Sequence, residues 1–166
     1  PIVVSAPLSP DLEEYMTNTI LPRVEAIKSG SVDPKDDNML KITHDMRTSS
    51  VDMRLINPNL PIDPENKVSL AVDNVYRIWK ETKKRRATQL LFCDMGVPKG
   101  TADKEVEVED DKESTATDEA ESADSVVLYE DIRSRLVKKG IPANEIAFIH
   151  SAKTDAQKQK LFNAFN

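Results

Sequence analysis

The side chains best suited to chemistry in this sequence lie near its C-terminal end, around one of two histidines. His150 follows a short apolar run and is followed by Ser151 and Thr154, which precede a predicted helix. The first N–H groups of a helix have no partner within it, and they bind phosphate readily. This order of residues would allow a phosphate contact at Thr154, although a plain helix cap is the more common arrangement. In the alternative interpretation, Thr154 only caps the helix and His150 only closes a turn.

Several catalytic chemistries are excluded by what the sequence lacks. With only four glycines it has no Gly-rich phosphate loop, and its lone cysteine, Cys93, permits no internal disulfide. No cysteine–histidine set has the spacing of zinc ligands. His44 stands between Thr43 and Asp45, but consecutive helical residues do not face one another, so we expect an ordinary surface or interhelical histidine. The sequence therefore predicts no catalytic residue, metal or cofactor in this chain.

Helical periodicity dominates the first half of the chain. Helices are predicted over residues 9–30, after Asp36 or Asp37, and from Asp63, because cap residues precede apolar positions spaced three or four apart. Pro22 should kink or interrupt the first helix, because proline has no N–H to donate. The third helix carries an apolar stripe at Val68, Val72, Val75 and Trp79.

Two apolar runs in the second half decide the predicted fold class. Gln89–Cys93 and Ile146–Ile149 lack polar alternation, which is typical of strands covered on both faces in a parallel sheet. Helices are predicted at about 125–139 and after Thr154. Strand, helix, strand, helix behind a helical segment predicts an α/β fold with a partial parallel sheet flanked by helices. Asp94 would then lie at the carboxyl end of the first strand, where such sheets bind ligands.

Charge is distributed unevenly along the chain. The net charge is −6, but residues 103–124 hold eleven acidic residues and two lysines, so the remainder carries +3. Residues 97–124 have almost no large apolar side chains and are predicted to form an acidic, disordered insertion. It is either a partner-binding loop or a solvated segment. The basic run Lys83–Arg86 either contacts nucleic acid or is a solvated helix end that matches the helix dipole.

The predicted organisation is a helical segment over residues 1–62 and an α/β domain over residues 63–166. No apolar stretch is long enough to cross a membrane, and no signal-peptide pattern is present, so we expect a cytoplasmic location without membrane contact. The chain begins at Pro1 rather than at methionine, and we expect it to be part of a longer protein.

Two long stretches carry a family resemblance. NKVSLAVDNVYRIWKETKKRRATQLLFCDMG and YEDIRSRLVKKGIPANEIAFIHSAKTDAQKQKLFNAFN resemble the start of the second RecA-like lobe of superfamily 2 helicases. The most similar members are the Swi/Snf-type helicase-like proteins of phages and mobile elements, which are often fused to DNA methylases. Residues 89–94 take the place of helicase motif IV. The resemblance covers residues 38–166 without the acidic insertion.

The end of the chain matches that family in part. Phe165 and Asn166 fit the Phe-Asn pair that follows an arginine by seven residues in Swi/Snf-type proteins. Lys158 stands in place of that arginine, and the exchange is not neutral because lysine cannot form the planar two-bond fork of arginine. His150 and Ser151 stand where Gly-Ser is usual.

The resemblance implies a truncated second lobe of an ATP-dependent DNA helicase or translocase. ATP and Mg²⁺ would bind in the parent protein, and the partners would be DNA and the first RecA-like lobe of the same chain. Since the arginine-bearing motif of that family is missing here, we expect this chain to be inactive by itself. Backbone phosphates would be contacted by Asp94, Ser151, Thr154 and Lys158. The alternative is a non-enzymatic α/β protein-interaction module that uses the acidic insertion or the N-terminal helices.

Overall fold

The computed structural model of the chain describes residues 2–93, 95 and 127–165. These residues belong to two compact units, Pro1–Asn74 (unit 1) and Val75–Asn166 (unit 2), with the division inside one long helix. Asp94 and the predicted insertion at residues 97–124 lie outside the described residues.

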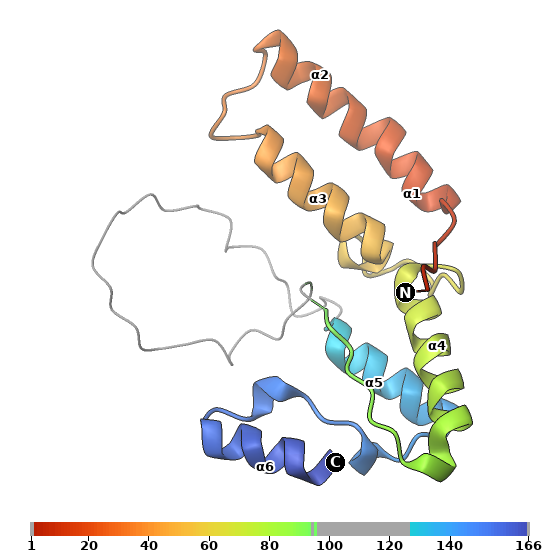
Figure 1. Cartoon of the computed structure of the whole chain (residues 1–166). Coiled ribbons are helices and arrows are strands. Elements are labelled where there is room, and N and C mark those ends of the chain that lie inside the picture. Colours follow the sequence, from red (N-terminus) through yellow and green to blue (C-terminus); the bar gives the residue numbers. More distant parts are fainter. Residues whose placement is uncertain (1, 94, 96–126, 166) are drawn as a thin grey trace. The chain divides into compact units, whose positions relative to one another are not determined.

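Unit 1 is a helical hairpin followed by a short irregular segment (Figure 1). Its elements are α1 (Pro10–Tyr15), η1 (Met16–Ile20), α2 (Leu21–Ser29), α3 (Met39–Val51), η2 (Met53–Leu55) and the first part of α4 (Lys67–Thr82). The first three elements run on without a break, and α3 packs against α2 and η1. Ile20 and Ile42 are buried, one from each side of the hairpin.

The first helix starts and ends where the sequence predicts. The Ser9 hydroxyl accepts a hydrogen bond from the N–H of Leu12 at 3.3 Å, with Pro10 at the first helical position. Gly30 ends the helix in the left-handed region at φ 70°, which glycine adopts without a Cβ clash. The expected interruption at Pro22 takes the form of the π-helical turn η1 just before it. A wider turn there avoids the clash that a proline ring makes in a regular α-helix.

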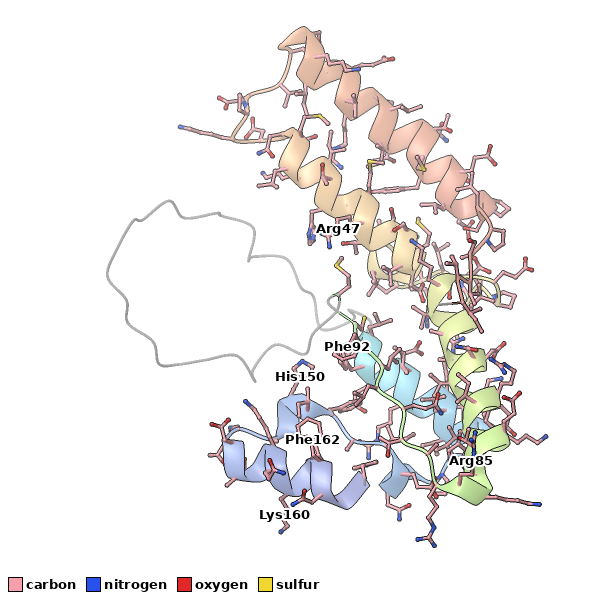
Figure 2. The ribbon with its side chains drawn as sticks, in the orientation of Figure 1. Arg47, Arg85, Phe92, His150, Lys160 and Phe162 are labelled. Atoms are coloured by element: carbon pink, nitrogen blue, oxygen red, sulfur yellow. The ribbon has the colours of Figure 1, made fainter. Side chains whose placement is uncertain are left out.

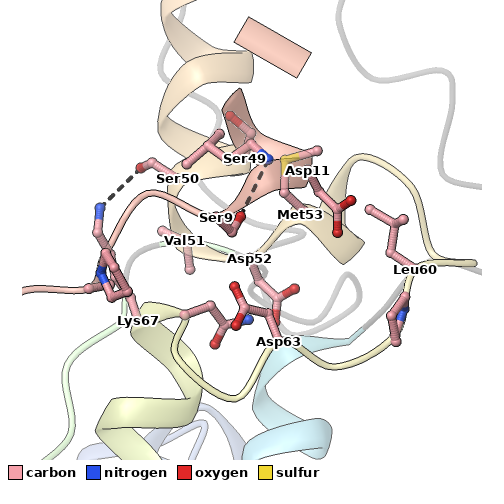
Figure 3. A pocket seen from close by; sticks show the side chains of 15 residues that line it. Ser9, Asp11, Ser49, Ser50, Val51, Asp52, Met53, Leu60, Asp63 and Lys67 are labelled. Atoms are coloured by element: carbon pink, nitrogen blue, oxygen red, sulfur yellow. Dashed lines mark hydrogen bonds between the residues drawn. The ribbon is translucent and has the colours of Figure 1, made fainter. Parts of the chain in front are cut away.

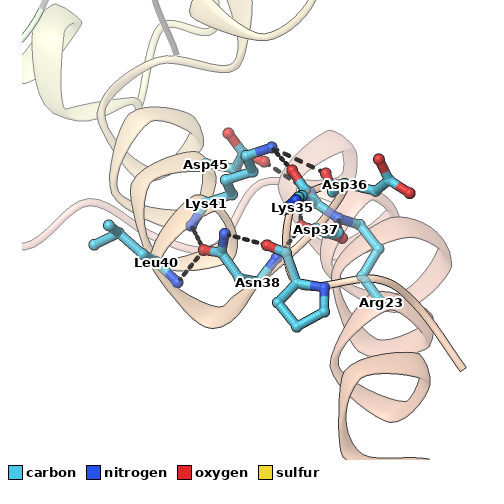
Figure 4. Close-up of polar contacts among 9 residues, drawn as sticks. Arg23, Lys35, Asp36, Asp37, Asn38, Leu40, Lys41 and Asp45 are labelled. Carbon is cyan, nitrogen blue, oxygen red and sulfur yellow. Dashed lines mark hydrogen bonds and ion pairs between the residues drawn. The ribbon is translucent and has the colours of Figure 1, made fainter. Parts of the chain in front are cut away.

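An arginine joins the two sides of the hairpin (Figure 4). The Arg23 guanidinium on α2 donates two bonds to the Asp37 carboxylate, at 2.6 and 2.8 Å, and a third to Asp45 on α3 at 2.7 Å. The bonds from Arg23 hold the pKa of Asp37 below its usual value. The fork geometry of arginine suits this paired contact, which therefore fixes the loop between the helices.

Replacing this arginine should change how stability depends on pH. In Arg23→Gln we expect unfolding to need about 1 kcal/mol less free energy at neutral pH, since the ion pairs are partly exposed. Because the pKa of Asp37 is lowered in the folded state, its contribution is present above the unfolded pKa and is lost as pH falls through the folded pKa. Urea unfolding between about pH 7 and pH 2.5 should show the variant and the wild type converging below about pH 4. A constant difference at all these pH values would contradict this role of Arg23.

Two helix starts differ from the sequence prediction. Asn38, and not Asp36 or Asp37, caps α3, because its side-chain oxygen accepts the N–H groups of Leu40 and Lys41 at 3.0 Å. Likewise α4 starts at Lys67, and the Asn66 side chain accepts the N–H of Ser69 at 2.8 Å. Asp63, the predicted cap, instead accepts the N–H of Glu65 in the preceding turn. Asparagine and aspartate are both good caps, so composition alone does not choose between neighbours.

Unit 2 consists of helices joined by short connections (Figure 1). Its elements are the rest of α4, η3 (Lys83–Arg85), α5 (Leu128–Lys139), η4 (Ala143–Glu145), η5 (Ile149–Ser151) and α6 (Asp155–Phe165). Buried apolar side chains line one face of α5 and the turn after it: Leu128, Ile132, Leu136 and Ile141. Gly140 ends α5 as predicted, at φ 106°.

The predicted α/β fold with a RecA-like parallel sheet is wrong. The described residues are 64% helical and include no strand. Ile146 and Phe148 have extended backbone angles, but Ile149 begins the single turn η5. In the other run, the Cys93 carbonyl accepts the Tyr129 hydroxyl rather than a strand N–H.

The first predicted strand is too exposed to lie in the middle of a sheet. A central parallel strand needs cover on both faces, whereas the Leu90 and Phe92 side chains are 69% and 87% exposed. A short apolar run does not by itself determine its secondary structure, which depends on the elements that pack on it.

No helix among the described residues is long and apolar enough to cross a membrane.

Candidate nucleic-acid interface

The described part of unit 2 is strongly basic. It contains 13 lysines and arginines against five aspartates and glutamates, a net charge of +8. Four of the five carboxylates lie beside a cation of their own helix, in the pairs Arg77–Glu81, Glu130–Arg133, Asp131–Arg135 and Asp155–Lys158. Outside those pairs stands a set of exposed cations: Lys80, Lys83, Lys84, Arg85, Arg86, Lys138, Lys153 and Lys160. All of unit 2, Val75–Asn166, holds 16 lysines and arginines against 17 aspartates and glutamates, so the positive charge belongs to these described residues and not to the unit as a whole.

The densest group of cations ends α4. Residues Lys83–Arg86, here called the basic turn, comprise η3 and Arg86, whose φ of 50° reverses the chain direction. The ammonium of Lys83 lies 4.6 Å from the centre of the Trp79 ring, a cation–π contact. The indole N–H of Trp79 in turn donates to Glu145 on η4 at 2.7 Å. These contacts hold Lys83 at the start of the basic turn, and the other three cations of the turn are exposed.

A second feature of unit 2 is an aromatic cluster, defined as Tyr129, Phe148 and His150. The Tyr129 ring meets Phe148 edge-on at 5.7 Å and His150 edge-on at 4.9 Å between ring centres. The Arg133 guanidinium lies 5.7 Å from the centre of the Phe148 ring. The hydroxyl of Tyr129 donates to the carbonyl of Cys93, which places the run that contains Phe92 beside the cluster (Figure 2).

Three of the four predicted phosphate-contacting residues lie at the start of α6. The Ser151 hydroxyl donates to the Phe148 carbonyl at 2.6 Å. The Thr154 hydroxyl accepts the N–H of Gln157 at 3.3 Å, so Thr154 is the helix cap. Lys158 is exposed, with its ammonium 3.7 Å from the Asp155 carboxylate. Asp94, the fourth, lies outside the described residues.

The N-terminal cap of α6 already engages backbone N–H groups that could otherwise bind a phosphate. The side-chain oxygen of Gln157 accepts the N–H groups of Lys153 and Thr154, at 2.8 and 3.2 Å. This reciprocal arrangement is a capping box, which satisfies the first free N–H groups of a helix. The structure thus shows Thr154 as a helix cap, as in the alternative interpretation. A phosphate contact by Ser151, Thr154 or Lys158 stays a prediction.

One cavity of unit 1 is small (Figure 3). The cavity is about 30 Å³ and is lined by Ser49, Asp52 and Asn66 among others, which leaves room for about one water molecule. The side-chain nitrogen of Asn66 is buried without a hydrogen-bond partner, so such a water would satisfy it. Asp52 is engaged by Arg54 at 2.7 Å. His44 is exposed on α3, as an ordinary surface residue would be.

Within the described residues, no group of three or more histidine, cysteine, aspartate or glutamate side chains could hold a metal ion. Comparisons with protein-family models, with curated proteins and with solved structures find no match to this chain.

Sequence reasoning identified the basic turn but missed the aromatic cluster. Tyr129 and His150 are 21 positions apart, and no local pattern predicts that their rings meet. One signal was present. Phenylalanine, tryptophan and tyrosine make up only 5% of the chain, yet Tyr129 and Phe148 both lie in the C-terminal forty residues.

Proposed function

We propose that this chain binds the phosphate backbone of nucleic acid through unit 2, as a piece of an ATP-dependent DNA helicase or translocase. The observation that carries the proposal is the basic turn, in which four consecutive cations are all exposed. Clustered lysines and arginines replace the counterions of a phosphate backbone, and the released ions supply most of the binding free energy. Such contacts fix position on the nucleic acid without reading its sequence.

The motor role rests on the resemblance to helicase-like proteins. In that setting ATP and Mg²⁺ bind elsewhere in the parent protein, and this piece holds the track while the first lobe moves. Because the described residues include no strand, the proposed contact would lie at helix ends and turns rather than in loops after strands. The basic turn and Lys153, Lys158 and Lys160 around α6 are the cations best placed for it, since all are exposed.

The acidic segment provides a test of this proposal against its rival. Residues 103–124 carry a net charge of −9, opposite in sign to the +8 of the described part of unit 2. Deleting them should leave thermal unfolding unchanged and raise DNA affinity by no more than about threefold, because a competing negative charge is removed. Fluorescence anisotropy with a labelled oligonucleotide measures the change. A loss of DNA binding on deletion would contradict the proposal.

A second candidate function, a protein-interaction module, is favoured by one observation. Leu90 and Phe92 expose large apolar surfaces, which often mark protein contacts. Under this function the deletion of residues 103–124, or the replacement of N-terminal surface residues, would abolish capture of a protein partner and leave DNA binding absent throughout.

A further inference from the structure

We infer that the aromatic cluster, together with Phe92, is a stacking platform for the unpaired bases of single-stranded nucleic acid. The inference rests on the proposed function and names its substrate class: a single strand rather than a duplex.

Phe92 is unusually exposed for a phenylalanine. Its side chain is 87% exposed, whereas that of Phe162 is 46% exposed and those of Phe148 and Phe165 are partly buried. With Leu90 and Leu91, which are 69% and 46% exposed, Phe92 forms a contiguous exposed apolar run, and such patches often mark binding sites. The backbone that carries it is held in place, because the carbonyl of the next residue, Cys93, accepts the Tyr129 hydroxyl.

The cluster provides further ring surface close to that point. The Tyr129 ring lies edge-on to both Phe148 and His150, so the rings stand at different angles instead of closing into a single stack. Phe148 and His150 are each only partly buried. In the view of Figure 2, His150 lies between Phe92 and Phe162. Base faces stack on such rings whatever the base identity.

The cations near this apolar surface indicate which kind of partner it binds. Arg133 lies against the Phe148 ring at 5.7 Å, and Lys153 is exposed two residues after Ser151. An apolar protein segment gains nothing from these cations, whereas a nucleic-acid strand presents bases to the rings and phosphates to the cations. In a duplex the base faces are already covered by their neighbours, so only a single strand can use the rings.

The test compares strands in the full chain. Anisotropy titrations use a labelled oligothymidylate of about 20 nucleotides and a duplex of the same length, at one fixed salt concentration. Phe92→Ala should weaken oligothymidylate binding about tenfold and leave duplex binding within about twofold. Phe92→Trp should retain the wild-type affinity, because it keeps a stacking ring. Leu90→Ala is the matched control, since it removes an exposed apolar side chain from the same run and should change neither affinity.

A second probe, an oligonucleotide without bases, tests whether the rings bind bases. An abasic oligonucleotide of equal charge should bind the wild type about as weakly as oligothymidylate binds Phe92→Ala, and the variant should lose nothing further on this probe. Equal losses from Phe92→Ala and Leu90→Ala would overturn the inference, because they would indicate general apolar contact. A Phe92→Ala variant that binds both strands like the wild type would also overturn it, while leaving the proposed function intact.

Two other outcomes would also overturn the inference. If the wild type binds neither strand, both this inference and the proposed function fail. If Phe92→Ala abolishes a concentration-dependent dimer in sedimentation without changing oligothymidylate affinity, a second copy covers the ring and the inference is overturned.

Discussion

An Asp52→Ala variant should lose about 3–5 kcal/mol of unfolding free energy, because it leaves a buried arginine without its carboxylate. Asp52 is 2% exposed and Arg54 is 7% exposed. The carboxylate accepts bonds from the Arg54 backbone N–H at 3.0 Å and from its guanidinium at 2.7 Å. A lone buried charge keeps its full desolvation cost, which is why breaking such a pair costs more than the pair itself contributes. Urea unfolding followed by far-ultraviolet circular dichroism measures the loss.

Two further variants show whether the loss comes from the buried charge. Asp36→Ala removes an exposed carboxylate nearby in the sequence and should change the unfolding free energy by less than about 0.5 kcal/mol. A double variant, Asp52→Leu with Arg54→Leu, should recover much of the stability, since apolar residues of similar size often replace a buried ion pair at little cost. If Asp52→Ala costs no more than Asp36→Ala, the pair is not a structural element of unit 1.

Neutralising two cations of the basic turn should weaken nucleic-acid binding about 10- to 30-fold at about 50 mM salt, because each cation replaces a counterion of the backbone. The variant is Lys84→Gln with Arg85→Gln. Both side chains are exposed and lie outside the ion pairs of unit 2, so the fold should be unaffected. Anisotropy titration with the oligonucleotides of the stacking test measures the change.

The matched control neutralises two exposed lysines of unit 1, Lys28→Gln with Lys35→Gln. It changes the net charge of the chain by the same amount, so a general charge effect would appear equally in both variants. We expect the control to change affinity by less than about threefold. Equal losses in the two double variants would mean that the basic turn makes no specific contact with the backbone.

Local features of the fold were predictable from the sequence, and long-range ones were not. The Ser9–Pro10 start, the Gly30 and Gly140 ends and the Thr154 cap follow from the conformational preferences of single residues, and the structure confirms them. The predicted strands depended on burial by partners elsewhere in the chain. Since the Phe92 side chain is exposed, no such cover exists for its run among the described residues, and the predicted sheet is wrong.

The candidate site likewise has parts that the sequence predicts and parts that it does not. The basic turn is contiguous in sequence, so its charge could be read directly from Lys83 to Arg86. The charge of the described part of unit 2 could be counted only once that part was known, because the acidic residues 103–124 fall within the same unit. The meeting of Tyr129 with His150 and with the Cys93 carbonyl depends on how α5 packs, which no spacing rule supplies.

The most direct test of the central claim is a salt titration of nucleic-acid binding by the full chain. The binding constant for a labelled oligonucleotide is measured between about 50 and 300 mM salt. If unit 2 binds the phosphate backbone, the logarithm of the constant should fall linearly with the logarithm of salt concentration, with a slope of about −3 or steeper. An affinity that does not change with salt, or no binding at the lowest salt, would contradict the claim.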